Sequence, residues 1–462
     1  MAPPQLKRVL SLTDVVLFNV VVIFSVRGMT TAAKMGPVSI LLWLLAVGTF
    51  FVPLGLTVTE LATRDPGVGG FYRWTRDAVG DLHGFMGAWF YWVSNLTYLP
   101  SLLIFLAGAI GFVIGKPALG NDPVFVASLS LTVLWLTAWL NIRGLSAGKL
   151  LTNGGAIASW AAAVMLILAG AVTYSRLGSA NSLSPHAFTA LSGGTQTLAY
   201  FATLTFALVG LELAPVLGGE IKEPVRTLPR AILISALVIA VLDIVGTLAI
   251  LVALPTAEIS PISGALGAVQ AVASRAGLGF VGALVAALVA FSVVGGVSAW
   301  LGGAARLPLA IGIDHFLPEP MARLHPKHGT PHIAILFQTV LVSVFIIVSQ
   351  LGSSVAEAYF VLVDLTIILN FIPFIYLFVA LPILRPDRPE PGVVRVPGGK
   401  GMAWLVGGAG LLATLLSLGS AVIPAPDVAN PAVFEAKLWG GLFAFTLSGY
   451  IIYRTCRAPA TK

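Results

Sequence analysis

Apolar segments of roughly 20 residues recur along the whole chain, and a segment of that length crosses the hydrocarbon core of a bilayer as a helix. The core offers no water, so each segment must satisfy its backbone hydrogen bonds internally. Only 10% of the residues are charged and 57% are hydrophobic, with a mean hydropathy of +0.96. These values lie far outside the range of water-soluble domains. The sequence therefore predicts an all-α integral membrane protein.

We predict twelve transmembrane helices, at 12–33, 37–61, 82–114, 122–142, 149–175, 192–217, 229–254, 277–312, 331–350, 355–383, 402–423 and 433–455. An even number of spans places both termini on one side of the membrane. Nineteen lysines and arginines then fall on that side and four on the other, so both termini are expected to be cytoplasmic, with the protein in the cell inner (plasma) membrane. The net charge of +7 is scattered over short loops, which argues against nucleic acid as a partner.

Two of the predicted helices carry a glycine and a charge near the middle of the membrane. The first contains Ser25, Arg27 and Gly28, and the sixth contains Gly210 and Glu212. A charge at this depth is costly and marks a candidate functional site. Two interrupted helices five spans apart predict a five-plus-five inverted repeat with the binding site between the breaks.

This symmetry suggests a division of the chain into six parts. They are a cytoplasmic N-terminus (1–11), a first repeat (12–175), a second repeat (192–383), a cytoplasmic linker (384–401), two appended helices (402–455) and a cytoplasmic tail (456–462).

Three spaced motifs carry a family resemblance. They are GLE at 210–212 followed by EIKEPVRTLPRAI at 220–232, ELATRDPGVGGFY at 60–72, and DHFLP at 314–318 with GTPHIA at 329–334. Over roughly residues 8–385 the chain resembles the amino acid–polyamine–organocation (APC) family of transporters. The resemblance implies a LeuT-like fold that moves a small amine-bearing solute by alternating access.

The arginine/agmatine exchangers of that family suggest roles for individual side chains. The match places Phe206 on their aromatic gate, Glu212 on their proton-sensing carboxylate and Trp300 on their aromatic lid. The stretch 91–98, with Ser94, Asn95 and Tyr98, falls on their pocket wall.

The chain departs from the family at two places. Where many relatives have Gly-Ser-Gly, it has the stretch 24–28, FSVRG, which places the cation Arg27 at or beside the usual substrate carboxylate site. It also lacks the lysine that several proton-coupled relatives carry in the membrane part of helix 5.

The breaks themselves offer complementary chemistry to an α-amino acid. Amide N–H groups from about Gly28 onward lie at the positive end of a helix dipole and suit a carboxylate. Carbonyls near Ile23 and Leu208 lose their helical partners and can accept from an ammonium group. The candidate substrate-binding residues are Ile23, Ser25, Val26, Arg27, Gly28, Ser94, Asn95, Tyr98, Phe206, Leu208, Gly210 and Trp300. Glu212 and Asp364 are candidates for proton coupling or gating, because a buried carboxyl group can be neutral in one state and charged in another.

Several of these assignments have alternatives. Glu212 could instead make a structural hydrogen bond across its broken helix, and Arg27 could pair permanently with Glu212 or Asp364. Asp243, set among aliphatic residues, could serve packing or function. The aromatic candidates could be ordinary membrane core, and the hydroxyls of Ser292 and Ser298 leave room for a sodium site, although small-residue helices often use serine for packing.

The expected function is secondary active transport of amino acids across the cytoplasmic membrane, by proton-coupled symport or exchange; sodium is the less favoured coupling ion. The alternative is a polyamine permease or antiporter of the putrescine and spermidine type, which Arg27 disfavours unless it is paired. A channel would need repeated polar rings, and an enzyme would need a catalytic constellation at one depth. We expect neither, and no cofactor or metal site, since the histidines clustered at 315–332 suit a solvated loop.

Overall fold

The computed structural model describes residues 6–191, 194–259, 264–350, 355–388, 390–421 and 431–456. These residues form helices and connecting turns, and no β-strand occurs among them. Ten helical segments of the described chain are long and apolar enough to cross a membrane. The predicted all-α membrane fold is therefore confirmed.

Every predicted span has a helical counterpart. In order these are α1 Leu12–Ile23 with α2 Val26–Lys34; α3 Val38–Ala46, the π-helical η1 Val47–Phe51 and α4 Val52–Arg64; α6 Asp81–Val113; α7 Pro123–Ile142; α8 Leu145–Leu177; α10 Gly194–Ala207 with α11 Leu213–Val216; α12 Pro224–Ala253; α14 Gly279–Ala304 with α15 Arg306–Ile313; α16 His332–Ser349; α17 Val355–Leu384; α18 Gly399–Ala421; and α19 Pro431–Cys456. The sixth and twelfth are not among the ten apolar segments, because α10 ends after 14 residues and α19 carries Glu435, Lys437 and Arg454.

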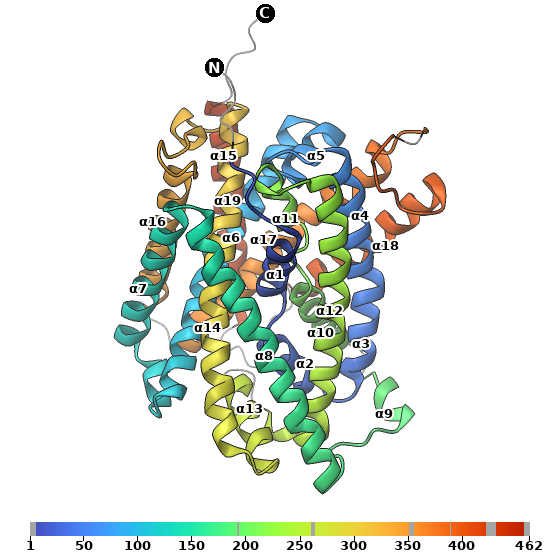
Figure 1. Cartoon of the computed structure of the whole chain (residues 1–462), viewed down its shortest axis with the longest axis vertical. Helices are drawn as coiled ribbons and strands as arrows, with labels where there is room; N and C mark the ends of the chain where they lie inside the picture. The colour runs from blue at the N-terminus through green and yellow to red at the C-terminus, as the bar shows by residue number, and fades with distance from the viewer. Residues whose placement is uncertain are drawn as a thin grey trace, which may run out of the picture.

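Shorter elements connect the spans. They are the helices α5 Phe71–Val79, α9 Pro185–Thr189 and α13 Gly264–Arg275, and the 3-10 turns η2 Pro117–Asn121, η3 Gly218–Glu220, η4 Thr256–Glu258 and η5 Glu319–Ala322. The beginning of α1 and the end of α19 lie at the same end of the bundle, as an even number of spans requires (Figure 1).

The broken first helix lies in the interior of the bundle, where α1 packs against α8, α12 and α14 (Figure 1). Glycines permit the close crossing of α8 and α14: a Cβ atom placed on Gly155 would lie 2.8 Å from the Cα of Gly295. Small residues at such crossings are how membrane helices gain packing contacts. The helix α6 lies against α14 and α17, and residues of all three helices share a cavity with the first break.

The segment 384–401, predicted as a linker, is docked onto α4. The buried carboxylate of Glu60 accepts a hydrogen bond from the Val396 amide at 2.7 Å and pairs with Arg385 at 3.3 Å. Arg385 in turn donates to the Val396 carbonyl at 2.7 Å. These contacts fasten the turn between α17 and α18 to the core helices.

Candidate functional site

The first helix opens at Phe24 and Ser25. Ser25 has an extended backbone (φ −149°, ψ 140°) and caps α2, since its Oγ accepts a hydrogen bond from the Gly28 amide at 3.2 Å. The break therefore lies earlier than the sequence suggested: the Gly28 amide is occupied by Ser25, and the first amides of α2 are those of Val26 and Arg27. As in any helix, these first N–H groups have no partner within the helix.

The sixth helix opens between α10 and α11, around Gly210. Its φ of 138° is one that other residues rarely adopt, and a Cβ atom there would lie 2.6 Å from side-chain atoms of Val22 and Ile23. Glycine is therefore required where the second break contacts the first. The two breaks are packed against each other at the same depth.

The buried side chain of Glu212 bonds to the opened backbone of the second break. Only 1% of the residue is exposed, and its carboxylate accepts hydrogen bonds from the Tyr91 hydroxyl at 2.7 Å and the Gly210 amide at 3.0 Å. The carboxylate thus joins the opened backbone to α6. The structural hydrogen bond considered for this residue is present, and Glu212 is not part of the cavity lining described below.

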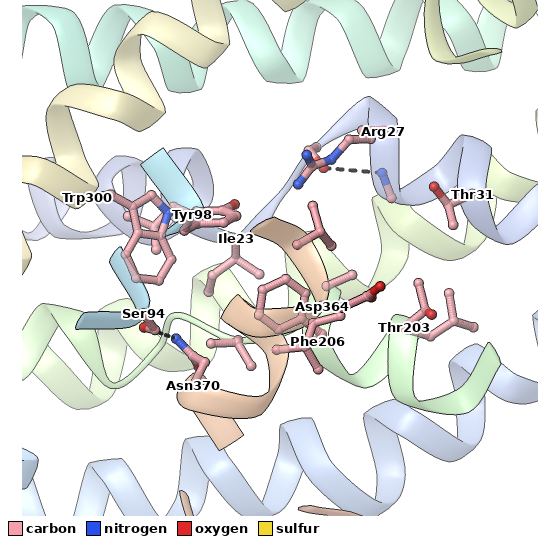
Figure 2. A pocket seen from close by; sticks show the side chains of 18 of the residues that line it. Ile23, Arg27, Thr31, Ser94, Tyr98, Thr203, Phe206, Trp300, Asp364 and Asn370 are labelled. Carbon is pink, nitrogen blue, oxygen red and sulfur yellow. Dashed lines mark hydrogen bonds between the residues drawn. The ribbon is translucent and has the colours of Figure 1, made fainter. Parts of the chain in front are cut away.

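A cavity of about 260 Å³ lies beside the two breaks, as Figure 2 shows in close-up. Ten predicted site residues line it: Ile23, Ser25, Arg27, Gly28, Ser94, Asn95, Tyr98, Phe206, Trp300 and Asp364. Four others do not: Leu208, Gly210 and Glu212 lie behind it, and Val26 lines a smaller adjoining cavity of about 40 Å³.

The sequence analysis missed further lining residues. They are Val22, Thr31, Thr203, Leu204, Ala207, Val209, Val363, Ile367 and Asn370. Most lie one helical turn from a predicted residue, so 3.6-residue spacing on either side of each break would have indicated Thr31, Thr203 and Ile367. Asn370 had no such signal, because its membership depends on how α17 packs against α6.

Aromatic rings close one end of the cavity. Trp300 Nε1 donates a hydrogen bond to the Val22 carbonyl at 3.1 Å, which occupies an acceptor at the end of α1. Tyr98 lies edge-on to Trp300 and to Phe206, with ring centroids 5.2 and 6.1 Å apart. Phe206 makes a further edge contact with Phe371. These contacts hold the aromatic side chains around the breaks in one packed group.

Two charged side chains line the cavity, Arg27 and Asp364. The Arg27 guanidinium lies 5.8 Å from the centre of the Phe105 ring. Among the ion pairs of the described residues, none joins Arg27 to Glu212 or to Asp364. The cavity thus offers a guanidinium and a carboxylate that are not bonded to each other.

Two serines among the other candidates have structural partners. Ser298 accepts from the Asn141 side chain at 3.0 Å, and Ser292 donates to the Val289 carbonyl at 2.8 Å. Asp243 is 2% exposed and lies outside the cavity lining. No group of His, Cys, Asp and Glu in the described part of the chain has a geometry that could hold a metal ion.

Ion pairs and charged hydrogen bonds lie at the end of the bundle where α1 begins. Arg306 makes two 3.0 Å contacts to the Glu220 carboxylate, with both side chains almost fully buried. Tyr72 donates to Asp314 at 2.8 Å, and burial together with the Asp314 charge raises the pKa of Tyr72, so the phenol stays neutral and remains a donor. Asp14 at the start of α1 accepts from Asn153 of α8 at 2.8 Å.

A cavity at the meeting point of two broken membrane helices is the arrangement of a secondary transporter. The amino acid permease family model matches residues 10–444, nearly the whole chain, and the protein belongs to this family. It is a multi-pass membrane transporter with the fold that the APC resemblance implied.

Similar proteins have related descriptions. An uncharacterized transporter of Legionella pneumophila is 30% identical over 95% of both chains. A probable agmatine/putrescine antiporter of Lactococcus lactis is 24% identical over 97% of this chain and 95% of its own. A glutamate/gamma-aminobutyrate antiporter of the same species is 22% identical over 82% of this chain and 77% of its own.

Proposed function

We propose that the protein carries an amino acid across the cytoplasmic membrane by alternating access, in symport with protons or in exchange for a second solute. One observation carries the proposal: Arg27, in the first turn of α2, lines the cavity where the first helix opens. A guanidinium beside a helix N-terminus is a binding place for a carboxylate. Amines without a carboxylate have no group of opposite charge to offer to Arg27.

The ammonium group of the substrate is assigned to backbone carbonyls, whose partial charge is negative. At the ends of α1 and α10 the carbonyls of Val20, Val22, Thr205 and Phe206 already accept hydrogen bonds. The ammonium group is therefore assigned to the carbonyls of Ile23 and Ala207, the last residues of these two helices, which both line the cavity. The predicted inverted repeats, 12–175 and 192–383, are part of this proposal, in which one repeat rocks against the other around the site. The termini are assigned to the cytoplasm from the distribution of basic residues.

Coupling to protons is proposed through Asp364 and Glu212. Asp364 lines the cavity, where substrate and solvent reach it, and Glu212 bonds to the backbone of the second break. Protonation of Glu212 changes the hydrogen bonds at the second break, and protonation of Asp364 changes the charge of the cavity lining. Sodium coupling is less favoured, since the Ser298 hydroxyl already bonds to Asn141.

A ligand screen on the purified protein in detergent tests the proposal. Melting temperatures are measured with each of the twenty L-amino acids, putrescine, spermidine and agmatine, at mildly acidic and neutral pH, with and without sodium. A ligand that binds only the folded state raises the melting temperature. Stabilisation by L-amino acids, followed by saturable uptake into proteoliposomes, is expected. Stabilisation by diamines alone would replace this proposal with the polyamine alternative.

A further inference from the structure

Basic side chains gather where α7 ends beside the loop that precedes α16. Arg143 follows the last residue of α7, and Lys327 and His328 lie in the loop. The Thr330 hydroxyl of the same loop donates a hydrogen bond to the Ile142 carbonyl at 2.8 Å. This hydrogen bond fastens the loop to the end of α7, so the basic side chains of both elements stay together.

A histidine fixes the shape of the loop. His325 Nδ1 accepts hydrogen bonds from the amides of Lys327 and His328, each at 3.2 Å, and the His325 amide donates to the Thr330 carbonyl at 2.7 Å. Because Nδ1 is an acceptor, the proton of the neutral His325 ring is on Nε2. The rings of His325 and His328 lie 4.6 Å apart. One tight turn therefore presents two imidazoles and an ammonium group.

The charges of this region have no acidic partner among the described residues. Desolvation and the neighbouring His325, Lys327, Arg143 and Lys7 lower the pKa of His328, so these five groups are close enough to interact. We call them the basic patch. Among the ion pairs of the described residues, none includes Lys7, Arg143 or Lys327. The basic patch therefore carries positive charge that is not compensated within this part of the chain.

The acids of the connection between α15 and α16 are used elsewhere. Asp314 pairs with Arg76 and accepts a hydrogen bond from Tyr72, and Glu319 pairs with Arg323. The connection thus neutralises other basic residues at this end of the bundle and leaves the basic patch charged. A binding partner of the patch must be an anion.

An exposed apolar face begins directly beside the basic patch. Trp135, Trp139 and Arg143 follow each other at four-residue spacing, and the Arg143 guanidinium lies 4.0 Å from the centre of the Trp139 ring. Trp135 and Trp139 are 43% and 47% exposed, and Trp135 Nε1 donates to Ser343 of α16 at 3.2 Å. The two helices are in contact and lie at the edge of the bundle (Figure 1). Exposed tryptophans near the end of a span are typical of the boundary between hydrocarbon and headgroups.

We propose that the basic patch binds the phosphate group of an anionic phospholipid, whose acyl chains lie on the face of α7 and α16 that carries Trp135 and Trp139. Guanidinium, ammonium and imidazole groups all donate hydrogen bonds to phosphate oxygens. A lipid suits both parts of the site, since its phosphate complements the charge and its acyl chains complement the exposed apolar face. A soluble anion would use the patch alone.

Lipids with the same acyl chains test the choice of headgroup. The melting temperature of the detergent-purified protein is measured with graded amounts of palmitoyl-oleoyl phosphatidylglycerol or phosphatidylcholine. Phosphatidylglycerol should stabilise the protein at a concentration at least about tenfold lower than phosphatidylcholine does. Equal effects of the two lipids would overturn the proposal. Glycerol 1-phosphate and inorganic phosphate should not stabilise the protein at these concentrations; stabilisation equal to that by phosphatidylglycerol would overturn the assignment to a lipid.

Two variants with the same change in net charge locate the effect. The test variant replaces three exposed basic residues of the patch: Lys7→Gln, Arg143→Gln and Lys327→Gln. The control variant replaces three exposed basic residues elsewhere at the same end of the bundle: Lys222→Gln, Arg230→Gln and Arg454→Gln. The preference for phosphatidylglycerol should fall at least about tenfold in the test variant and persist in the control. An equal loss in both would show that overall charge attracts the lipid, which contradicts a site at the patch.

Brominated lipids provide a second measurement that leaves the patch unchanged, should the test variant fail to fold. Bromine on the acyl chains quenches the fluorescence of nearby tryptophans. Brominated phosphatidylglycerol should quench the protein more than brominated phosphatidylcholine at equal concentration. The double variant Trp135→Phe with Trp139→Phe should lose this difference, whereas Trp404→Phe, at an exposed position of α18, should keep it. A difference that persists in the double variant would place the lipid elsewhere and overturn the proposal.

Discussion

The Tyr91 hydroxyl on α6 lies 2.7 Å from the Glu212 carboxylate, and the same carboxylate accepts from the Gly210 amide at 3.0 Å. One buried side chain therefore joins the opened sixth helix to the helix that carries Ser94 and Asn95. The Tyr91 carbonyl also holds both of those side chains in place. A change at Glu212 can thus reach the cavity wall without contact between Glu212 and the substrate.

Replacing Glu212 by Gln should abolish net uptake and leave substrate binding intact. Gln has the same size and can still accept from Gly210, but it cannot take up or release a proton. Uptake into proteoliposomes across a range of pH, with binding measured in detergent, checks this. Tyr91→Phe is the matched control, since it removes the other partner and keeps the carboxyl group. Unchanged uptake with an unchanged pH profile in Glu212→Gln would exclude a coupling role.

Replacing Arg27 by Ala should weaken the binding of ligands that have a carboxylate. Hydrogen bonds to charged groups contribute about 1.5–3 kcal/mol, so a loss of about tenfold or more in affinity is expected. Arg27→Lys keeps the charge but loses the bidentate hydrogen-bonding geometry of the guanidinium. Its affinity for ligands with a carboxylate should therefore lie between those of the unchanged protein and of Arg27→Ala. Affinity for amines without a carboxylate serves as the internal comparison. If amino acids and such amines lose affinity equally, Arg27 has a structural role.

Replacing Trp300 by Phe should weaken the packing of the aromatic side chains at the end of the cavity. The substitution keeps a ring and removes the hydrogen bond to the Val22 carbonyl, worth about 0.5–1.5 kcal/mol. We expect a two- to tenfold loss of substrate affinity, measured by thermal shift at graded ligand concentrations. Trp92→Phe is the control, because Trp92 bonds to Gln338 and does not line the cavity. An equal loss in both variants would mean that the effect comes from general packing.

Breaking the buried pair of Arg306 and Glu220 should strongly destabilise the protein. A buried charge left without its partner costs about 3–5 kcal/mol, so Arg306→Met should lower the melting temperature markedly. The double change Arg306→Met with Glu220→Gln should recover part of the loss. The exposed pair of Arg323 and Glu319 provides the contrast, since such pairs contribute about 1 kcal/mol or less. Similar effects at the two pairs would contradict this account.

The loop before α16 should lose stability in acid. Desolvation and the nearby His325, Lys327 and Arg143 lower the pKa of His328. A lowered pKa in the folded state gives stability that is present above the unfolded value of about 6.5 and is lost as pH falls through the folded value. The melting temperature should therefore fall less between neutral and acidic pH in His328→Gln than in the unchanged protein. Parallel pH curves would show that His328 does not contribute.

The helices were predictable because a bilayer leaves the backbone few choices. Each apolar segment of membrane length had to be a helix, and the two breaks were visible because Arg27 and Glu212 are out of place in hydrocarbon. The motif match added Phe206, Trp300 and the residues around Ser94. In the structure these residues line the cavity. Their roles in binding remain predictions.

Only the tertiary structure decided which polar groups meet. The sequence placed Glu212 in the site. In the packed structure its carboxylate lies outside the cavity lining and bonds to Tyr91, which is 121 positions away in the chain. Asn370 drew no attention in the sequence, and it became a cavity residue because α17 lies against α6 at the level of Ser94. Helical periodicity determines which residues share a face of one helix, but the rotation and depth of one helix against another come from packing over the whole bundle. For that reason the sequence by itself determined the membrane helices and their breaks, and the structure decided how the cavity between them is lined.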